Sequence, residues 1–166
     1  MFGGGYCLDP VELLVVGLGF EAMGLLDELE AKAKIQKLKY LLPFPAPMEA
    51  SRRSLDLLRR LQEHHSLKPS DVIRTAVRSV SDTFDRLLSI TQSNSKPAML
   101  APFGPKTSSL GMAIFATLTD SQVFYTQPSV YHPDYTSGIS QKNGSDETYC
   151  YAIRLNSVDQ FNLNDI

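Results

Sequence analysis

Apolar and polar residues form blocks along the chain that predict strands and helices in alternation. Nearly continuous apolar runs at 11–19 and 98–103 are typical of strands that are buried on both faces of a parallel sheet. Two shorter apolar segments, 37–44 and 122–126, predict further strands. The more alternating segment 148–155 predicts an edge or antiparallel strand.

Helical periodicity fills most of the sequence between these runs. Apolar residues recur at helical spacing and predict helices over 20–36, 48–65, 68–91 and 106–118. In the third of these, Ser70 or Asp71 is suited to the N-cap position. Its apolar stripe, which we interpret as core packing, consists of Ile73, Val77, Val80, Phe84, Leu87 and Leu88.

Alternating strands and helices predict an α/β fold, a Rossmann-like three-layer sandwich with a mainly parallel sheet of about five strands. The 166 residues favour a single domain over 1–166. Within it, the segment 127–147 is polar and rich in proline, glycine and serine, which predicts a long loop. We expect the polar tail 156–166 to be poorly ordered or lightly docked.

The charge balance narrows the classes of partner. Sixteen basic and 18 acidic residues give a net charge of −2, which offers no basis for broad nucleic-acid or membrane binding. No apolar run approaches the roughly 18 residues of a membrane span, and the first residues lack the pattern of a signal peptide. Cys7 and Cys150 form no metal or redox motif, and a disulfide between them stays open. We expect a cytoplasmic protein without a cofactor or metal.

Ligands of open α/β sheets bind outside the carboxyl ends of the strands. Four segments follow predicted strands and have unusual composition, namely 17–21, 43–54, 102–109 and 127–138. This coincidence predicts where a site would lie.

The first two segments each have two interpretations. Gly17 and Gly19 match a loose GxGxxA dinucleotide-binding pattern, but the acidic residue that this pattern requires at the end of the second strand is missing. The structural alternative is a tight turn that brings a helix close to the sheet. Arg52 and Arg53 are suited to phosphate or carboxylate binding. Alternatively they are solvated and paired with acidic residues one turn away.

The third segment carries the sharpest signal. Gly104 permits a turn, and the next residues open a helix with the cation and hydroxyls of Lys106, Thr107, Ser108 and Ser109. Free N–H groups at a helix start bind anions, and lysine and hydroxyls add charge and donors. The segment is not a P-loop, because Leu100 and Pro105 occupy the positions of its two glycines. A helix capped by Thr107 or Ser108, with Lys106 in solvent, is the equally weighted alternative.

The fourth segment mixes aromatic and titratable side chains. Tyr131 and Tyr135 are suited to stacking on a base or docking on a protein, or to anchoring a surface loop. His132 and Asp134 suggest acid–base chemistry. However, they are only two positions apart in a proline-rich loop, so their side chains need not face each other.

Residues 100–116, "LAPFGPKTSSLGMAIFA", resemble the strand–turn–helix of CARF-type and SAVED-type Rossmann sensor domains. Those families bind cyclic oligonucleotides at a Gly-Thr-Lys-like turn before an apolar helix. The resemblance implies a ligand at Gly104, Lys106 and Ser108, with residues 17–21 as the other half of the pocket.

These observations suggest three functions, which we give with the most favoured first. The first is a non-catalytic α/β domain that binds a phosphate-bearing ligand, such as a nucleotide or cyclic oligonucleotide, as a sensor or regulatory subunit. The second is a protein-interaction subunit of a larger assembly, or a homodimer, without a small ligand. The third is a small hydrolase that uses His132 and Asp134. We assign no catalytic residue and lean towards a protein without enzymatic activity.

Overall fold

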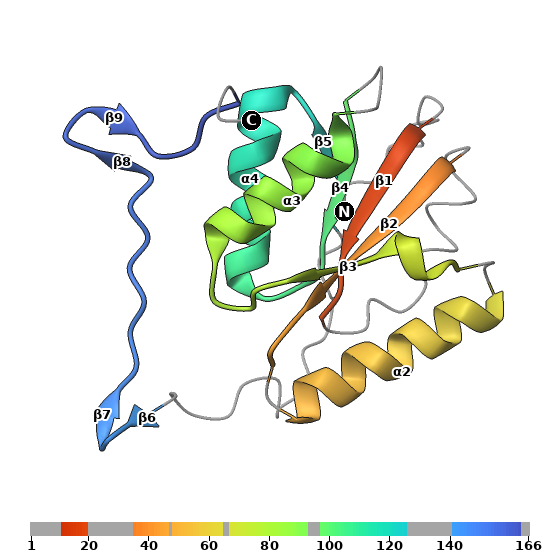
Figure 1. Ribbon diagram of the computed structural model, residues 1–166, viewed down its shortest axis with the longest axis horizontal. Coiled ribbons are helices and arrows are strands. Elements are labelled where there is room, and N and C mark those ends of the chain that lie inside the picture. The colour runs from red at the N-terminus through yellow and green to blue at the C-terminus, as the bar shows by residue number, and fades with distance from the viewer. Residues whose placement is uncertain are drawn as a thin grey trace, which may run out of the picture.

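Five parallel strands form the central sheet of the computed structural model (Figure 1). They are β1 (Val11–Gly17), β2 (Ile35–Pro43), β3 (Val72–Thr75), β4 (Met99–Pro102) and β5 (Gln122–Val123), in the order β3-β2-β1-β4-β5. The structure describes residues 11–19, 35–46, 48–64, 67–92, 97–125 and 141–163. The helix predicted over 20–36 lies outside these residues, except that its last two positions begin β2.

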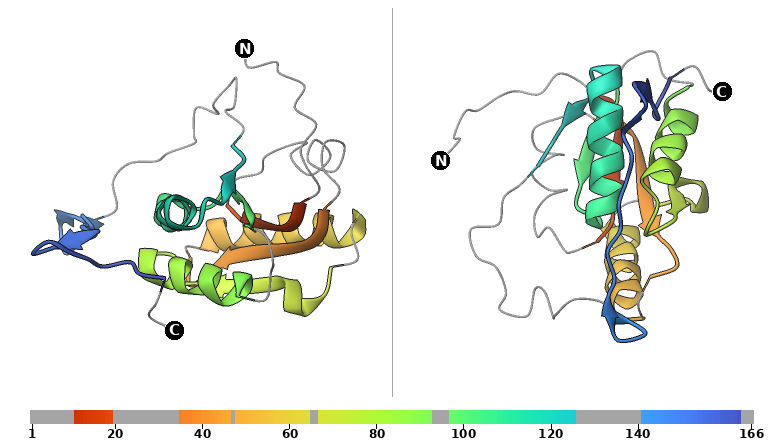
Figure 2. Two further views of the ribbon diagram at one scale, coloured as in Figure 1. Left: turned by 90° about the horizontal axis from the view of Figure 1, so that it is seen from above. Right: turned by 90° about the vertical axis from the view of Figure 1, so that its left-hand side faces the viewer.

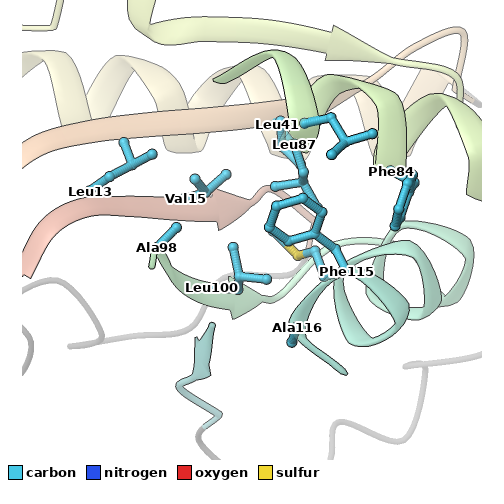
Figure 3. Packing of buried hydrophobic residues seen from close by; sticks show 11 residues of the cluster. Leu13, Val15, Leu41, Phe84, Leu87, Ala98, Leu100, Phe115 and Ala116 are labelled. Carbon is cyan, nitrogen blue, oxygen red and sulfur yellow. The ribbon is translucent and has the colours of Figure 1, made fainter. Parts of the chain in front are cut away.

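The helices cover both faces of this sheet. They are α2 (Met48–His64), α3 (Val80–Thr91) and α4 (Lys106–Thr119), with a single 3-10 turn, η1 (Pro69–Asp71), before β3. Leu14 and Val16 of β1 pack in one apolar cluster with Leu61 of α2. Leu13 and Val15, which point to the opposite face, pack in a second cluster with α3 and α4 (Figure 3). The predicted three-layer α/β sandwich with a parallel sheet is confirmed.

The layer formed by α3 and α4 depends on close contact between the two helices. A Cβ atom on Gly111 of α4 would lie 2.9 Å from both the Cβ of Thr83 and the carbonyl oxygen of Val80 in α3. Below this crossing, the rings of Phe84 and Phe115 meet edge to face with their centroids 5.7 Å apart. The small residue thus lets the helices approach, and the aromatic pair fills the space beneath them.

The helix predicted over 68–91 is wrong in its first half. That segment forms η1, β3 and a turn before α3 begins at Val80. Ile73 of β3 packs against the same apolar cluster as Phe84 and Leu87 of α3. Because strand and helix cover one cluster in succession, their apolar residues imitate a single helical stripe.

The strand predicted over 148–155 is also wrong. β3 supplies the fifth strand of the sheet instead. Residues 148–153 have no regular structure, and β8 (Arg154–Leu155) forms a small antiparallel hairpin with β9 (Val158–Asp159). A second hairpin, β6 (Gln141–Lys142) and β7 (Ser145–Asp146), occupies the end of the predicted polar loop, whose residues 127–140 lie outside the described residues.

The C-terminal segment lies along the side of the α3–α4 layer, as Figure 2 shows for the stretch between β7 and β8. The ring of Phe161 packs edge to face on Phe84 with a centroid distance of 5.2 Å, so the tail is docked on the core at this point. None of the helices in the described residues is long and apolar enough to cross a membrane.

Candidate ligand-binding edge of the sheet

The strand order reverses beside β1. The chain proceeds from β1 to β2 and β3 on one side, and then returns to place β4 and β5 on the other side. In open parallel sheets this reversal marks the point where the turns after adjacent strands diverge and ligands bind. Here the two turns are 17–19 after β1 and 103–105 after β4. We call the row of turns that follow the strands the carboxyl edge.

The turns after β1 and β4 are in backbone contact. A Cβ atom on Gly19 would lie 2.4 Å from the carbonyl oxygen of Phe103 and 2.8 Å from the Cα of Gly104. One on Gly104 would lie 3.2 Å from the carbonyl oxygen of Leu18. The structure therefore brings Gly17, Gly19 and Gly104 together, as the sequence suggested, and a ligand would lie over these turns rather than between them.

Helix α4 starts at this contact without a side-chain cap. Pro105 is its N-cap residue, no side chain of the described residues accepts a hydrogen bond from its first turn, and that turn has no acidic residue. The first N–H of the helix that donates a hydrogen bond within the described residues is that of Ser109, to the carbonyl oxygen of Pro105 at 2.9 Å. The N–H groups of Lys106, Thr107 and Ser108 therefore have no acceptor among the described residues. Together with the helix dipole and the exposed Lys106 side chain, they make this end of α4 electropositive.

The hydroxyl groups of this turn face protein atoms. Thr107 Oγ1 donates to the carbonyl oxygen of Val77 at 2.5 Å, and Ser109 Oγ lies 3.5 Å from the carbonyl oxygen of Pro102. Ser108 is buried against α3. The predicted cap by Thr107 or Ser108 is not formed, and of the four side chains proposed at this turn, Lys106 alone is exposed.

A third turn, between β3 and α3, joins this edge and was missed because β3 was predicted as helix. Ser79 caps α3 by accepting the N–H of Asp82 at 3.1 Å, and Asp82 accepts the N–H of Ala76 at 2.7 Å. The Ser-x-x-Asp spacing of a helix start was the sequence signal that could have found it. The hydrogen bond from Thr107 to Val77 holds this turn beside the first turn of α4. Arg78, next to Val77, is exposed.

Two aromatic rings also lie at this edge and were not singled out by the sequence. Phe103 follows β4 and Tyr125 follows β5, and their rings are parallel within 8° with centroids 6.3 Å apart. Tyr125 is 60% exposed, so much of its ring is open to solvent. The residues between β4 and α4 thus place an aromatic surface close in sequence to Lys106.

Arg52 and Arg53 are not brought to the start of α4. They belong to α2, which covers the opposite face of the sheet from α4. Arg52 lines an open hollow of about 380 Å³ on the outer side of α2, with Met48, Ser51, Leu55, Asp56 and Arg59. Asp56 there lies 3.5 Å from Arg59. The hollow is separate from the turns after β1 and β4.

The aromatic and titratable side chains predicted after β5 belong to a segment that the structure does not describe. Tyr131, Tyr135, His132 and Asp134 lie outside the described residues. Within the parts of the chain that the structure describes, no group of three or more histidine, cysteine or acidic side chains is arranged to hold a metal ion. Cys150 is an exposed free thiol.

Fold and strand order define an α/β protein of the Rossmann type. Comparison with models of known protein families and with curated protein sequences gave no match.

Proposed function

We propose that this protein is a non-catalytic Rossmann-type domain that binds a phosphate-bearing ligand, a nucleotide or cyclic oligonucleotide, as a sensor or regulatory subunit. The observation that carries the proposal is the start of α4. Its N–H groups lack acceptors among the described residues, its first turn has no acidic side chain, and it begins where the strand order reverses. Such helix starts attract phosphate through oriented N–H groups and the helix dipole.

Lys106 supplies the mobile part of this site. Its ammonium group is exposed at the first helical position, where it adds a full positive charge to the partial charge of the helix end. A lysine on a flexible stem binds phosphate as a point charge and needs no fixed geometry. The hydroxyls of Thr107 and Ser109 serve the turn itself, since both face backbone carbonyls. This arrangement favours binding over nucleophilic chemistry.

The aromatic rings favour a nucleotide over inorganic phosphate. The Tyr125 ring is largely exposed and parallel to that of Phe103, which directly precedes the Gly104 turn. Exposed aromatic faces stack on nucleobases of any sequence, and this contact is worth about 1–3 kcal/mol per base. A ligand with a phosphate at α4 and a base against Tyr125 would use both features.

The test compares Lys106→Ala with Lys68→Ala, which removes the same charge before η1 at the opposite edge of the sheet. Calorimetric titration and melting curves would use inorganic phosphate, adenosine 5′-monophosphate and a cyclic oligoadenylate. We expect ligand to raise the melting temperature of the wild type. Lys106→Ala should weaken binding by up to about 1 kcal/mol, or roughly fivefold, whereas Lys68→Ala should not. The proposal is wrong if none of the three compounds binds at millimolar concentration.

The second candidate function is a protein-interaction subunit. The C-terminal hairpin favours it, because Ile153, Leu155 and Val158 all expose large apolar side chains there. Replacing Leu155 and Val158 by serine should abolish self-association or capture of a partner if this surface is used. Sedimentation of the purified chain, with and without these changes, measures the homodimer directly. Nucleotide binding should be unaffected by them.

A further inference from the structure

A carboxylate of the chain itself is held at the carboxyl edge. Arg78 Nη1 and Nη2 donate to Glu147 Oε1 and Oε2 at 2.9 and 3.1 Å, a two-pronged pair. Arginine binds carboxylate and phosphate groups through this same fork. The turn after β3 therefore has an arginine that is already occupied by an anion from the C-terminal segment.

Two tyrosines fasten the same segment, residues 147–151, which we call the strap. The Arg78 guanidinium lies 5.0 Å from the centroid of the Tyr149 ring, a cation–π contact. The Tyr149 hydroxyl donates to Glu147, and this hydrogen bond raises the pKa of the phenol above its ordinary value. Tyr151 donates its hydroxyl to the carbonyl oxygen of Arg78 at 3.0 Å. The ion pair of Glu147, the ring of Tyr149 and the hydroxyl of Tyr151 thus converge on Arg78.

Val77, the residue directly before Arg78, contacts the start of α4. The carbonyl oxygen of Val77 accepts the hydroxyl of Thr107, in the first turn of α4. The strap then continues along the side of the α3–α4 layer towards β8 (Figure 2). A negative side chain therefore lies at the turn that borders the proposed phosphate site.

We propose that the strap is a built-in competitor of the ligand: an anion bound at the first turn of α4 recruits Arg78, which leaves Glu147, and the strap is released. This inference rests on the proposed function, because it names the regulation of the same site. Release of the strap is then the signal that a bound nucleotide sends to the rest of the molecule or to a partner.

The energetics allow this exchange. The Arg78 side chain is 59% exposed and that of Glu147 is 14% exposed, so solvent reaches the pair from the arginine side and weakens its net contribution to stability. Exchange of a carboxylate for a phosphate keeps the arginine paired, so it does not leave an uncompensated charge. Binding of ligand and docking of the strap oppose each other, and the coupling must be reciprocal. Any change that loosens the strap should therefore tighten ligand binding, at most by the factor by which the docked strap weakens it.

Cys150 provides the means to observe the strap. It lies between Tyr149 and Tyr151 and its thiol is free and exposed, so a spin label attached there displaces no buried contact. In a Cys7→Ser background, we expect the label to become more mobile as adenosine 5′-monophosphate is added. In Glu147→Gln and in Tyr151→Phe it should be mobile without nucleotide. Both variants should bind the nucleotide about three- to fivefold more tightly.

Asp146→Asn is the matched control, since it removes a negative charge one residue away, outside the Arg78 contact. It should leave label mobility and affinity unchanged, and an equal gain in affinity would show that only net charge matters and overturn the proposal. A nucleotide that binds the wild type without mobilising the label overturns it as well, while the proposed function stands. If titration detects no binding of nucleotide or phosphate to any variant, the proposed function fails and this inference with it.

Discussion

Gly19 shows how strongly one residue constrains the candidate site. A side chain there would meet backbone atoms of Phe103 and Gly104, which cannot rotate away as a flexible side chain would. A side chain on Gly17 would meet only ordinary contacts, at 3.4 Å from the backbone nitrogen of Gly104 and 3.5 Å from Met112 Sδ. The two glycines of one turn are therefore not equivalent.

We predict that Gly19→Ala destabilises the protein by about 1–3 kcal/mol, because the turns after β1 and β4 must move apart to admit the new atom. Gly17→Ala serves as the control and should cost much less. Chemical denaturation of both variants measures the difference in the free energy of unfolding. Equal stability of the two variants would contradict the described contact between the turns.

For single residues, the sequence predicted the turn before α4 but not the direction of its side chains. The hydroxyls of Thr107, Ser108 and Ser109 looked like ligands for an anion because they cluster at a helix start. Thr107 instead donates to Val77, which is 30 residues away in the chain. No local pattern predicts such a partner, since it depends on how α4 packs beside the turn after β3.

At the element scale, an ion pair ties β2 to η1. Lys39 Nζ donates to Asp71 Oδ1 and to the carbonyl oxygen of Ser70, both at 2.9 Å. Burial alone would raise the pKa of Asp71, but the Lys39 hydrogen bond, the Lys68 N–H and both lysine charges outweigh it and lower the pKa. The charged form is thus favoured in the folded protein. The contact stabilises the fold above the ordinary pKa of 3.8, and this contribution is lost as the pH falls through the lowered value.

We predict that Lys39→Met lowers the free energy of unfolding by up to about 1 kcal/mol near pH 7. The difference from the wild type should shrink as the pH falls below about 4, where the unfolded chain already protonates Asp71. Urea denaturation across a pH series measures this. Asp71→Asn should remove the same pH dependence, and a difference that persists at pH 2 would contradict the assignment.

Strands that are buried on both faces were predictable, whereas a strand whose apolar spacing continues into the next helix was not. β1 and β4 are buried on both faces and read as continuous apolar runs, so their type was correct. β3 consists of Val-Ile-Arg-Thr, a β-branched sequence typical of strands, but it was read as helix because α3 continues its apolar spacing. The alternating residues of 148–153 looked like an edge strand, although their tyrosines serve contacts to Arg78.

At the scale of the whole molecule, the C-terminal segment is attached at two separate places. The strap holds Arg78, and Phe161 packs on Phe84 within the α3–α4 cluster. The sequence predicted a polar tail there because its few apolar residues stand singly among polar neighbours, which is a weak signal. Strand order was likewise beyond reach, since it depends on which faces the crossing helices cover.

We predict that Phe161→Ala lowers the free energy of unfolding by about 1–3 kcal/mol, because the partly buried ring contacts the core cluster. Proteolysis within residues 150–160 should also become faster than in the wild type. Leu163→Ala, at an exposed position two residues further on, is the control and should change neither quantity. Unchanged cleavage in Phe161→Ala would contradict the docking of the tail.

The hydrogen bond between Thr107 and Val77 has a consequence for when the site comes into existence during folding. The first turn of α4 takes its position from the turn after β3, so the candidate site requires a contact of long sequence separation. Such contacts form late in folding, because the entropy cost of closing the long loop between the two residues must be overcome first. A peptide that carries only β4 and α4 contains Lys106 but not the carbonyl that orients its turn. The proposed ligand recognition at this edge therefore requires the assembled chain, and a bound ligand would favour molecules whose sheet is complete.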